Sequence, residues 1–252
     1  MQNSTVEEPN FTLLLAGQHD AALAEAIKLF CPPLVSRWID RPSLSSILAD
    51  PSQVEESKLS FVLVGDDPEP GLIEAVQVVR DASYLLVVYL STHLPEGPIR
   101  AALYEHACIV IDAAGKGERS HNDRMMAQLV GTMVPLLGEN WFFCVDVCDF
   151  ITLFSDARHG ALGAVTVPLS EDADTTFQKI AASPMLAGRL QSCSGIYMGV
   201  VSGECFELEH FPAWSDAMYG LTGRGDITVV SGVRIGQHLP DDICNIIVLA
   251  VW

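Results

Sequence analysis

Two carboxylates, Asp146 and Asp149, stand three residues apart just after an apolar helical run. If a helix begins near Asp146, this spacing places both side chains on one face, one turn apart, at the positive end of the helix dipole. Carboxylates held in this way keep their charged form, which a functional site could use. They can also do no more than cap the helix, as an N-cap residue and a first-turn acid do. This stretch alone leaves both interpretations open.

A second group of polar side chains lies in the first half of the chain. Glu96 and Arg100 are four residues apart, which is the spacing of an ion pair on a helix surface. Asn122 stands at the start of a long apolar run, where it would serve as a helix N-cap. Cys144 and Cys148 are four residues apart with no histidine beside them, so we expect no metal site there.

The composition is that of a compact and strongly acidic protein. The 252 residues are 49% hydrophobic, which is enough apolar material for one large domain or two small ones. The formal net charge is -18. Such a charge repels phosphate backbones and anionic lipids, so we expect neither nucleic-acid binding nor adsorption to an acidic membrane.

Several features favour a cytoplasmic location. The first ten residues are polar and acidic and lack the basic and apolar regions of a signal peptide. No apolar run reaches the roughly 18 residues of a membrane span. The cysteines number seven, an odd count without a CxxC pair, which is typical of free thiols in a reducing compartment.

The first half of the chain alternates apolar strands with helices. This pattern predicts an α/β fold with a parallel sheet covered on both faces, in which ligands bind at the carboxyl ends of the strands. The predicted strands are 11–17, 34–39, 59–65, 84–90 and 108–111, and the main predicted helices are 21–29, 72–82 and 98–106.

A long helix and a different pattern follow. Apolar residues at i, i+3 and i+4 spacing predict a helix over 122–137, which we expect to lie between two layers. Beyond it, strands and helices alternate less regularly, which favours a smaller mixed sheet with helices on one side. The predicted strands are 161–169, 195–201, 227–233 and 243–252, and the predicted helices are 174–187 and 211–221, the second interrupted early by Pro212.

The order of short motifs in the second half resembles the tubulin superfamily, and within it FtsZ. Cys144-Val-Asp-Val-Cys-Asp149 is similar to the catalytic loop NxDxxD of that family, with Cys144 in place of Asn. The stretches 181–186 and 195–203 resemble the SSPL segment of the family and its following strand and turn. Thr228 to Trp252 resembles the two closing strands of the family. Counted from Cys144 to Trp252, the resemblance covers about 110 residues.

The resemblance implies three parts along the chain. A Rossmann-like parallel-sheet domain, degenerate as a nucleotide-binding domain, would span 11–121. A long central helix would occupy 122–142. An FtsZ-like C-terminal domain with a smaller mixed sheet would span 143–252.

The resemblance also implies roles for the polar residues. Glu96-Gly-Pro-Ile-Arg100 matches an EGxxR motif whose Glu and Arg contact the nucleotide in the family. Asn122 stands where the family has an Asn that contacts guanine. Subunits of the family stack head to tail, and the acid loop, here Asp146 and Asp149, acts in the nucleotide pocket of the next subunit.

The phosphate-binding loops of the family are degraded in this chain. The glycine-rich loop after the third strand is replaced by Gly65-Asp-Asp-Pro-Glu-Pro-Gly71, whose prolines have no N–H to donate. Each of its three acids would repel a phosphate charge by about 4 kcal/mol at about 4 Å and an effective dielectric constant of about 20. The first glycine loop keeps only Gly17 in Gly17-Gln-His-Asp20, and the region from Ile39 to Leu59 is shorter than in the family.

These departures predict that the chain has no GTP cofactor unless its phosphate loop is rearranged. Glu96, Arg100 and Asn122 would then be remnants of a nucleotide site, or simply an ion pair and a helix cap. The family usually continues after its last strand into a linker and a peptide that docks membrane tethers. This chain ends at Trp252, directly after the last predicted strand, so we expect no direct membrane anchor.

We therefore expect a non-GTP-binding FtsZ-like protein that is not itself an enzyme. It would use Asp146 and Asp149 to dock on, cap or modulate the filament of a partner such as FtsZ, and could complete the partner's catalytic site in trans. One alternative is a scaffold that self-assembles without nucleotide. The other is a divergent GTPase that uses Glu96, Arg100 and Asn122 with a rearranged phosphate loop.

Overall fold

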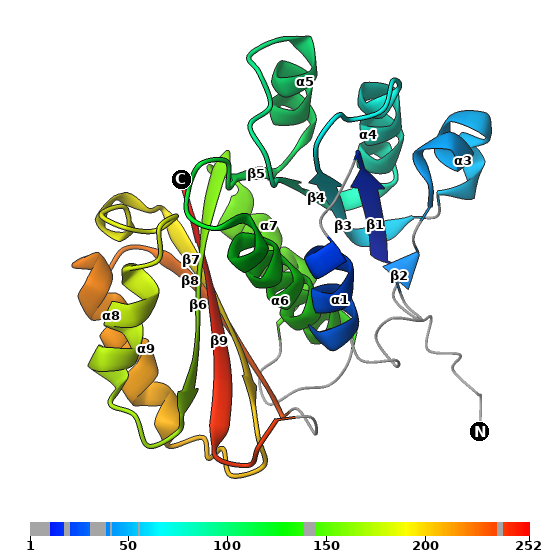
Figure 1. Ribbon diagram of the computed structural model, residues 1–252. Helices are drawn as coiled ribbons and strands as arrows, with labels where there is room; N and C mark the ends of the chain where they lie inside the picture. Colours follow the sequence, from blue (N-terminus) through cyan, green and yellow to red (C-terminus); the bar gives the residue numbers. More distant parts are fainter. Residues whose placement is uncertain are drawn as a thin grey trace, which may run out of the picture.

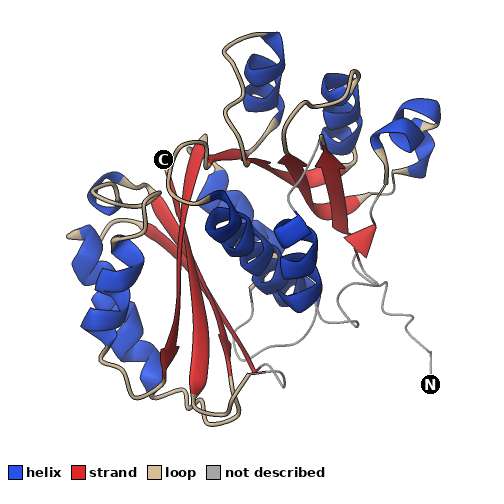
Figure 2. Ribbon diagram, in the orientation of Figure 1, coloured by secondary structure: helices blue, strands red, loops and turns tan. Residues whose placement is uncertain are grey.

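The computed structural model describes residues 11–17, 21–30, 39–40, 42–54, 56–138, 145–235 and 239–252. Figures 1 and 2 show one long twisted sheet with the helix α6 (Arg119–Gly138) lying across the middle of the molecule. The predicted arrangement is therefore present: strands and helices alternate before this helix, and a mixed sheet follows it.

The first half contains short, apolar strands separated by helices. The strands are β1 (Phe11–Ala16), β2 (Ile39–Asp40), β3 (Ser57–Val64), β4 (Ser83–Leu90) and β5 (Ile109–Asp112). The helices are α1 (Ala21–Phe30), α3 (Leu44–Ala49), η1 (Pro51–Gln53), α4 (Leu72–Asp81) and α5 (Pro98–His106). Residues 34–38 of the predicted second strand lie outside the described residues.

The second half contains longer strands with helices packed on both faces, not on one side as predicted: a Cβ atom on Gly195 would meet Leu153, whereas one on Gly163, on the opposite face, would meet Ile180. The strands are β6 (His159–Pro168), β7 (Gly195–Ser202), β8 (Thr228–Ile235) and β9 (Ile243–Val251). The helices are α7 (Val147–Phe154), α8 (Ala173–Ala181), η2 (Leu190–Ser192) and α9 (His210–Thr222). No helix of the described residues is long and apolar enough to cross a membrane.

Nine strands form a single sheet within the described part of the chain, in the order β2-β1-β3-β4-β5-β6-β9-β7-β8. The strands from β2 to β5 pair in parallel, whereas β9 is antiparallel to both of its neighbours. The two halves join where Val110 and Ile111 of β5 pair with His159 and Gly160 of β6. A Cβ atom on Gly160 would lie 2.9 Å from the side chains of Ile109 and Leu249, so glycine permits this close join.

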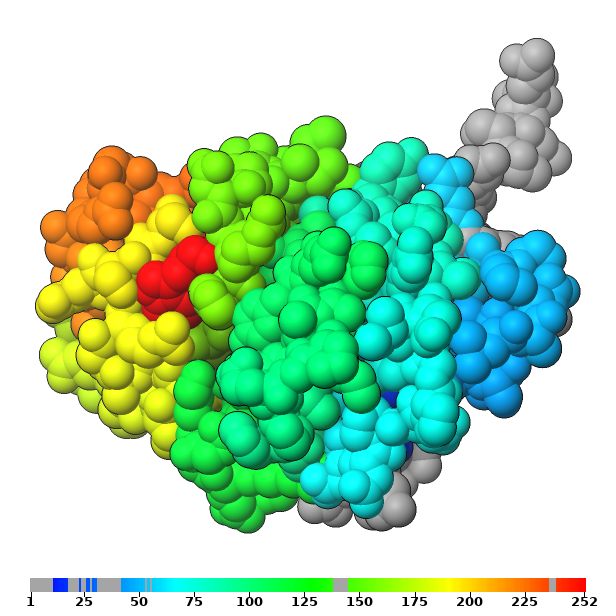
Figure 3. Space-filling model, turned by 90° about the horizontal axis from the view of Figure 1, so that it is seen from above, coloured from blue at the N-terminus to red at the C-terminus, as the bar shows by residue number. Residues whose placement is uncertain are grey.

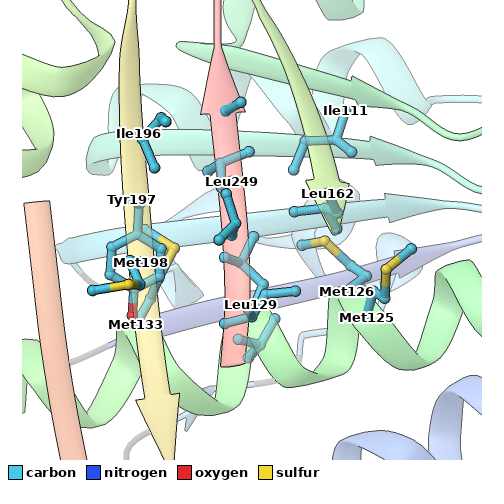
Figure 4. Close-up of a cluster of buried hydrophobic side chains, with 14 of the residues drawn as sticks. Ile111, Met125, Met126, Leu129, Met133, Leu162, Ile196, Tyr197, Met198 and Leu249 are labelled. Carbon is cyan, nitrogen blue, oxygen red and sulfur yellow. The ribbon is translucent and has the colours of Figure 1, made fainter. Parts of the chain in front are cut away.

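The helix α6 packs against the sheet with its apolar residues. Figure 4 shows Met125, Met126, Leu129 and Met133 of this helix facing side chains from β5, β6, β7 and β9. All four of these side chains are buried. On another side α6 crosses α1 closely, because a Cβ atom on Gly131 would overlap the carbonyl oxygen of Phe30. The predicted role of this helix as a central element between two layers is thus seen directly.

The opposite face of the parallel strands carries a second, smaller core. Side chains of α3, α4 and α5 pack there against alternate residues of β1, β3 and β4, as expected when both faces of a parallel sheet are covered. Successive residues of a strand therefore face opposite sides of the sheet: Leu13 faces the α6 side, whereas Leu14 faces the second core.

Two helix predictions in the second half need correction. The predicted helix 174–187 ends at Ala181, because Pro184 follows and the hydroxyl of Ser183 donates instead to the carbonyl of Leu162 at 3.0 Å. Pro212 does not interrupt the next helix. It lies in the first turn of α9, where backbone N–H groups have no acceptor within the helix, so the N–H that proline lacks costs no hydrogen bond.

Candidate functional site

The strand order identifies where a ligand would bind in the first half. The first five strands run β2-β1-β3-β4-β5, so the chain moves to one side of β1 and then returns to its other side at β3. Ligands of open parallel sheets bind outside the carboxyl ends of the strands at such a switch point. The arrowhead of β1 marks this end at the top of Figure 1, and Figure 3 looks down on it.

Backbone contacts continue the pairing of β1 and β3 past their carboxyl ends, and we call the resulting contact the closed switch point. The N–H of Gly65, after β3, donates to the carbonyl of Ala16 at the end of β1 at 2.8 Å. Gly17 follows with a φ of +81°, and a Cβ atom on it would overlap the carbonyl oxygen of Asp66. Gly17 and Asp66, which lie at the start of the two loops that would cradle a phosphate group in this fold class, therefore touch each other directly, while residues 18–20 of the first loop lie outside the described residues.

Beneath this contact lies a chain of polar side chains that joins three elements. Oδ2 of Asp66 accepts a hydrogen bond from Nη1 of Arg119, in the first turn of α6, at 2.6 Å. Nε of Arg119 lies 3.8 Å from Oδ2 of Asp123, whose side chain is fully buried. The hydroxyl of Tyr89, on β4, donates to Oδ1 of Asp123 at 2.8 Å. Burial, and then the negative charge of Asp123, raise the pKa of Tyr89, so this hydroxyl remains a donor at any physiological pH.

Our sequence reasoning missed Tyr89, Arg119 and Asp123. A signal was present in the sequence: Arg119 and Asp123 are four residues apart at the start of the longest of the described helices. A buried carboxylate at such a position requires a partner, since an isolated charge in the interior is costly. The spacing could not, however, identify Tyr89 or Asp66 as the partners.

The remainder of the acidic loop faces solvent. Asp67 has a φ of +46°, which is uncommon for a residue other than glycine, and its side chain is exposed, as is that of Glu69. Gly71, with a φ of +91°, precedes α4 and provides no side-chain cap for that helix. The loop thus presents negative charge outward and few backbone N–H groups.

We expect Gly17→Ala to destabilise the protein much more than Gly115→Ala. Both glycines have positive φ, so each alanine costs about 1–2 kcal/mol. A Cβ atom on Gly115 meets open space, whereas one on Gly17 meets the backbone of Asp66, which adds about 1–3 kcal/mol. Urea denaturation of both variants measures the difference. Equal losses of unfolding free energy would contradict the closed switch point.

Arg100 is occupied by partners within the chain. Its guanidinium pairs with Glu96 at 3.2 Å, as the i, i+4 spacing predicts, and also with Oδ2 of Asp112 at 2.8 Å. It further contacts the ring of Tyr104 and the carbonyl of Leu94. The hydrogen bond to Asp112 is the main reason why the pKa of Arg100 is raised. The side chain that would contact a nucleotide is therefore held by two carboxylates.

Asn122 does not cap a helix, which corrects our prediction. The helix α6 begins three residues earlier, at Arg119, so Asn122 lies inside its first turn and is buried. Its Nδ2 donates to the carbonyls of Lys116 and Ala113, at 3.0 and 3.4 Å, and so fastens the loop that leads into the helix. Its Oδ1 is a buried acceptor that makes no hydrogen bond to the described residues.

Asp146 and Asp149 form a capping box at the start of α7. Oδ1 of Asp146 accepts from the N–H groups of Cys148 and Asp149 at 2.6 and 3.2 Å. Oδ2 of Asp149 accepts in return from the N–H of Asp146 at 2.8 Å. The carboxylates thus lie on one helix end, as the spacing predicts, and each uses one oxygen for capping. Cys144, the first residue of the motif, lies outside the described residues.

The structure places Glu96, Arg100 and Asn122 around the carboxyl end of β5, where Arg100 pairs with Asp112 and Asn122 donates to the carbonyl of Ala113, but no contact joins them to the acid pair among the described residues. Glu96 and Arg100 belong to α5, Asn122 fastens the entrance of α6, and the acid pair begins α7. Among the described residues, no hydrogen bond connects these three groups. A cavity of about 410 Å³ does exist, but it lies at the amino ends of β3 and β4, lined by Glu56 and residues 81–84.

Comparisons with known proteins agree with this fold. No family model and no curated protein sequence matches the chain. A structure of an empty FtsZ dimer from M. jannaschii matches with a TM-score of 0.72 and 12% identity, over 97% of this chain and 88% of that one. GDP-form protofilaments of TubZ from Bacillus thuringiensis serovar israelensis match with a TM-score of 0.59 and 10% identity, over 96% and 85%. The predicted FtsZ/tubulin-like fold is confirmed.

Proposed function

We propose that this protein binds no GTP of its own and acts on a tubulin-like filament formed by a partner, in cell division or the cytoskeleton. The observation that carries the proposal is the closed switch point, where Gly17 meets the backbone of Asp66. The fold is that of proteins which assemble into protofilaments, as TubZ does. A chain with this fold and without an open phosphate site would join or bind a filament without a nucleotide of its own.

Charge supports the absence of a nucleotide. A polyphosphate at this end of the sheet would meet the exposed carboxylates of Asp67 and Glu69, which carry charge of the same sign. Arg119, a base near this end among the described residues, already pairs with Asp66. Arg100 is already paired with Glu96 and Asp112. Repulsion by these carboxylates therefore disfavours a bound polyphosphate.

The acid face at the start of α7 is the surface that we propose for the partner. Asp146 is exposed, and each capping carboxylate keeps a second oxygen that can face another molecule. The following exposed residues, Cys148 and Ile151, carry no charge, so the two carboxylates border a neutral helix surface. In a head-to-tail contact these acids would enter the nucleotide site of the partner and position its attacking water. A subunit with only one competent face can add at one filament end and block it.

One observation favours a second function. The capping box accounts fully for two acids at this spacing, and it would be equally useful in a scaffold that self-assembles without nucleotide through other surfaces. The two functions differ in one respect: only the first requires the charge of Asp146 and Asp149. Variants that keep the cap and remove the charge therefore separate them.

We expect the isolated protein to show no binding of GTP in a calorimetric titration with magnesium, and no hydrolysis above the rate of buffer alone. The reason is the combination of the closed switch point with the acidic loop after β3. Stoichiometric binding at micromolar affinity would refute the proposal. It would favour the divergent GTPase that uses Glu96, Arg100 and Asn122.

A further inference from the structure

The ion pair between Asp66 and Arg119 occupies the place at which this class of sheet holds a ligand. Asp66 follows β3 directly, at the carboxyl end of the strand and beside the end of β1. Its Oδ2 lies 2.6 Å from Nη1 of Arg119. Guanidinium groups are common receptors for carboxylate and phosphate oxygens because their N–H groups match both geometries.

Arg119 lies beside a buried carboxylate. Its Nε faces Oδ2 of Asp123 at 3.8 Å, and Asp123 is in turn fixed by the hydroxyl of Tyr89. Asp123 is fully buried, whereas 49% of the Asp66 side chain is exposed. The guanidinium thus lies between the buried carboxylate of Asp123 and the partly exposed carboxylate of Asp66.

We infer that Asp66 is an internal substitute for a ligand anion. Its carboxylate fills a small oxyanion site that Arg119 provides at the switch point, so the loop after β3 is fastened to the first turn of α6 without any ligand. The chain remains permanently in this closed arrangement. The inference rests on the proposed function, because it explains how a chain without nucleotide keeps its two loops together.

The neighbouring residue provides a contrast. Asp67 carries the same charge in the same loop, but its side chain is exposed and forms no ion pair with the described residues. Only one of the two adjacent acids therefore meets the guanidinium. This difference makes Asp67→Ala a matched control for Asp66→Ala, since both variants lose one negative charge at nearly the same place.

The test is titration of Asp66→Ala with inorganic phosphate, against sodium chloride at equal ionic strength, followed by thermal denaturation. We expect Asp66→Ala to bind phosphate at least ten-fold more tightly than the wild-type protein, with a Tm that rises as phosphate is added. Asp67→Ala should behave like wild type. The double variant Asp66→Ala/Arg119→Ala should lose the gain.

Three results would overturn the inference: no gain in Asp66→Ala, an equal gain in Asp67→Ala, or a gain that persists without Arg119. If Asp66→Ala does not fold, Asp66→Asn, which has the same size and no charge, replaces it in the same titration. These outcomes are distinct from failure of the proposed function. That failure would show as GTP binding by the wild-type protein, whereas the present inference depends only on the variants.

Discussion

Replacement of Asp123 with alanine will lower the free energy of unfolding by about 1–3 kcal/mol, because the buried hydroxyl of Tyr89 loses its acceptor. The variant loses the carboxylate that faces Arg119 and accepts the hydrogen bond of Tyr89. The hydroxyl of Tyr89 would then lack its acceptor in the interior, whereas Arg119 keeps its ion pair with Asp66. Urea denaturation monitored by circular dichroism measures the loss.

An ion pair at the surface provides the control. Arg224 and Asp226 pair through two hydrogen bonds of 2.9 and 3.0 Å, but the Asp226 side chain is 73% exposed. Exposed pairs contribute about 0–1 kcal/mol, so Asp226→Ala should be nearly neutral. If Asp123→Ala costs no more than Asp226→Ala, the buried chain of contacts does not hold the switch point.

The double variant Asp146→Asn/Asp149→Asn should weaken binding to the partner filament at least ten-fold while it leaves stability almost unchanged. Asparagine caps helices about as well as aspartate, so the start of α7 is preserved within about 1 kcal/mol. What disappears is the negative charge that the proposed contact requires. Binding is measured by titration of assembled partner filaments with the variant.

A second capped helix offers a matched control for this variant. Asp172 caps α8, accepting from the N–H of Thr175 at 2.9 Å, and Asp174 lies in the first turn of the same helix. Both side chains are exposed. Asp172→Asn/Asp174→Asn thus removes the same two charges from an equivalent helix start and should leave binding unchanged. An equal effect of the two double variants would indicate that only net charge matters.

Much of the fold could be predicted because it depends on local patterns. The apolar run from Leu85 to Leu90 predicts a buried strand, and the spacing of Met125, Leu129 and Met133 predicts a buried helix face. The spacing of Asp146 and Asp149 likewise predicts a shared helix end, and the structure shows it as a capping box. In each of these cases neighbouring residues determine the structure.

The contacts at the switch point could not be predicted because they join residues that are distant in sequence. Tyr89 and Asp123 are separated by 34 positions, and Asp66 and Arg119 by 53. No local pattern selects such partners. Asn122 was misplaced for a related reason: the carbonyl groups that hold its side chain belong to the preceding loop, so the helix starts earlier than its apolar pattern does.

The most direct test of the proposed function is co-sedimentation with the FtsZ-type filament of the same cell, with and without GTP. We predict that the protein pellets only with filaments assembled in GTP, that Asp146→Asn/Asp149→Asn stays in the supernatant, and that the protein alone never pellets. The account would be contradicted if the protein pellets by itself on addition of GTP, or if the double variant pellets with filaments as the wild type does.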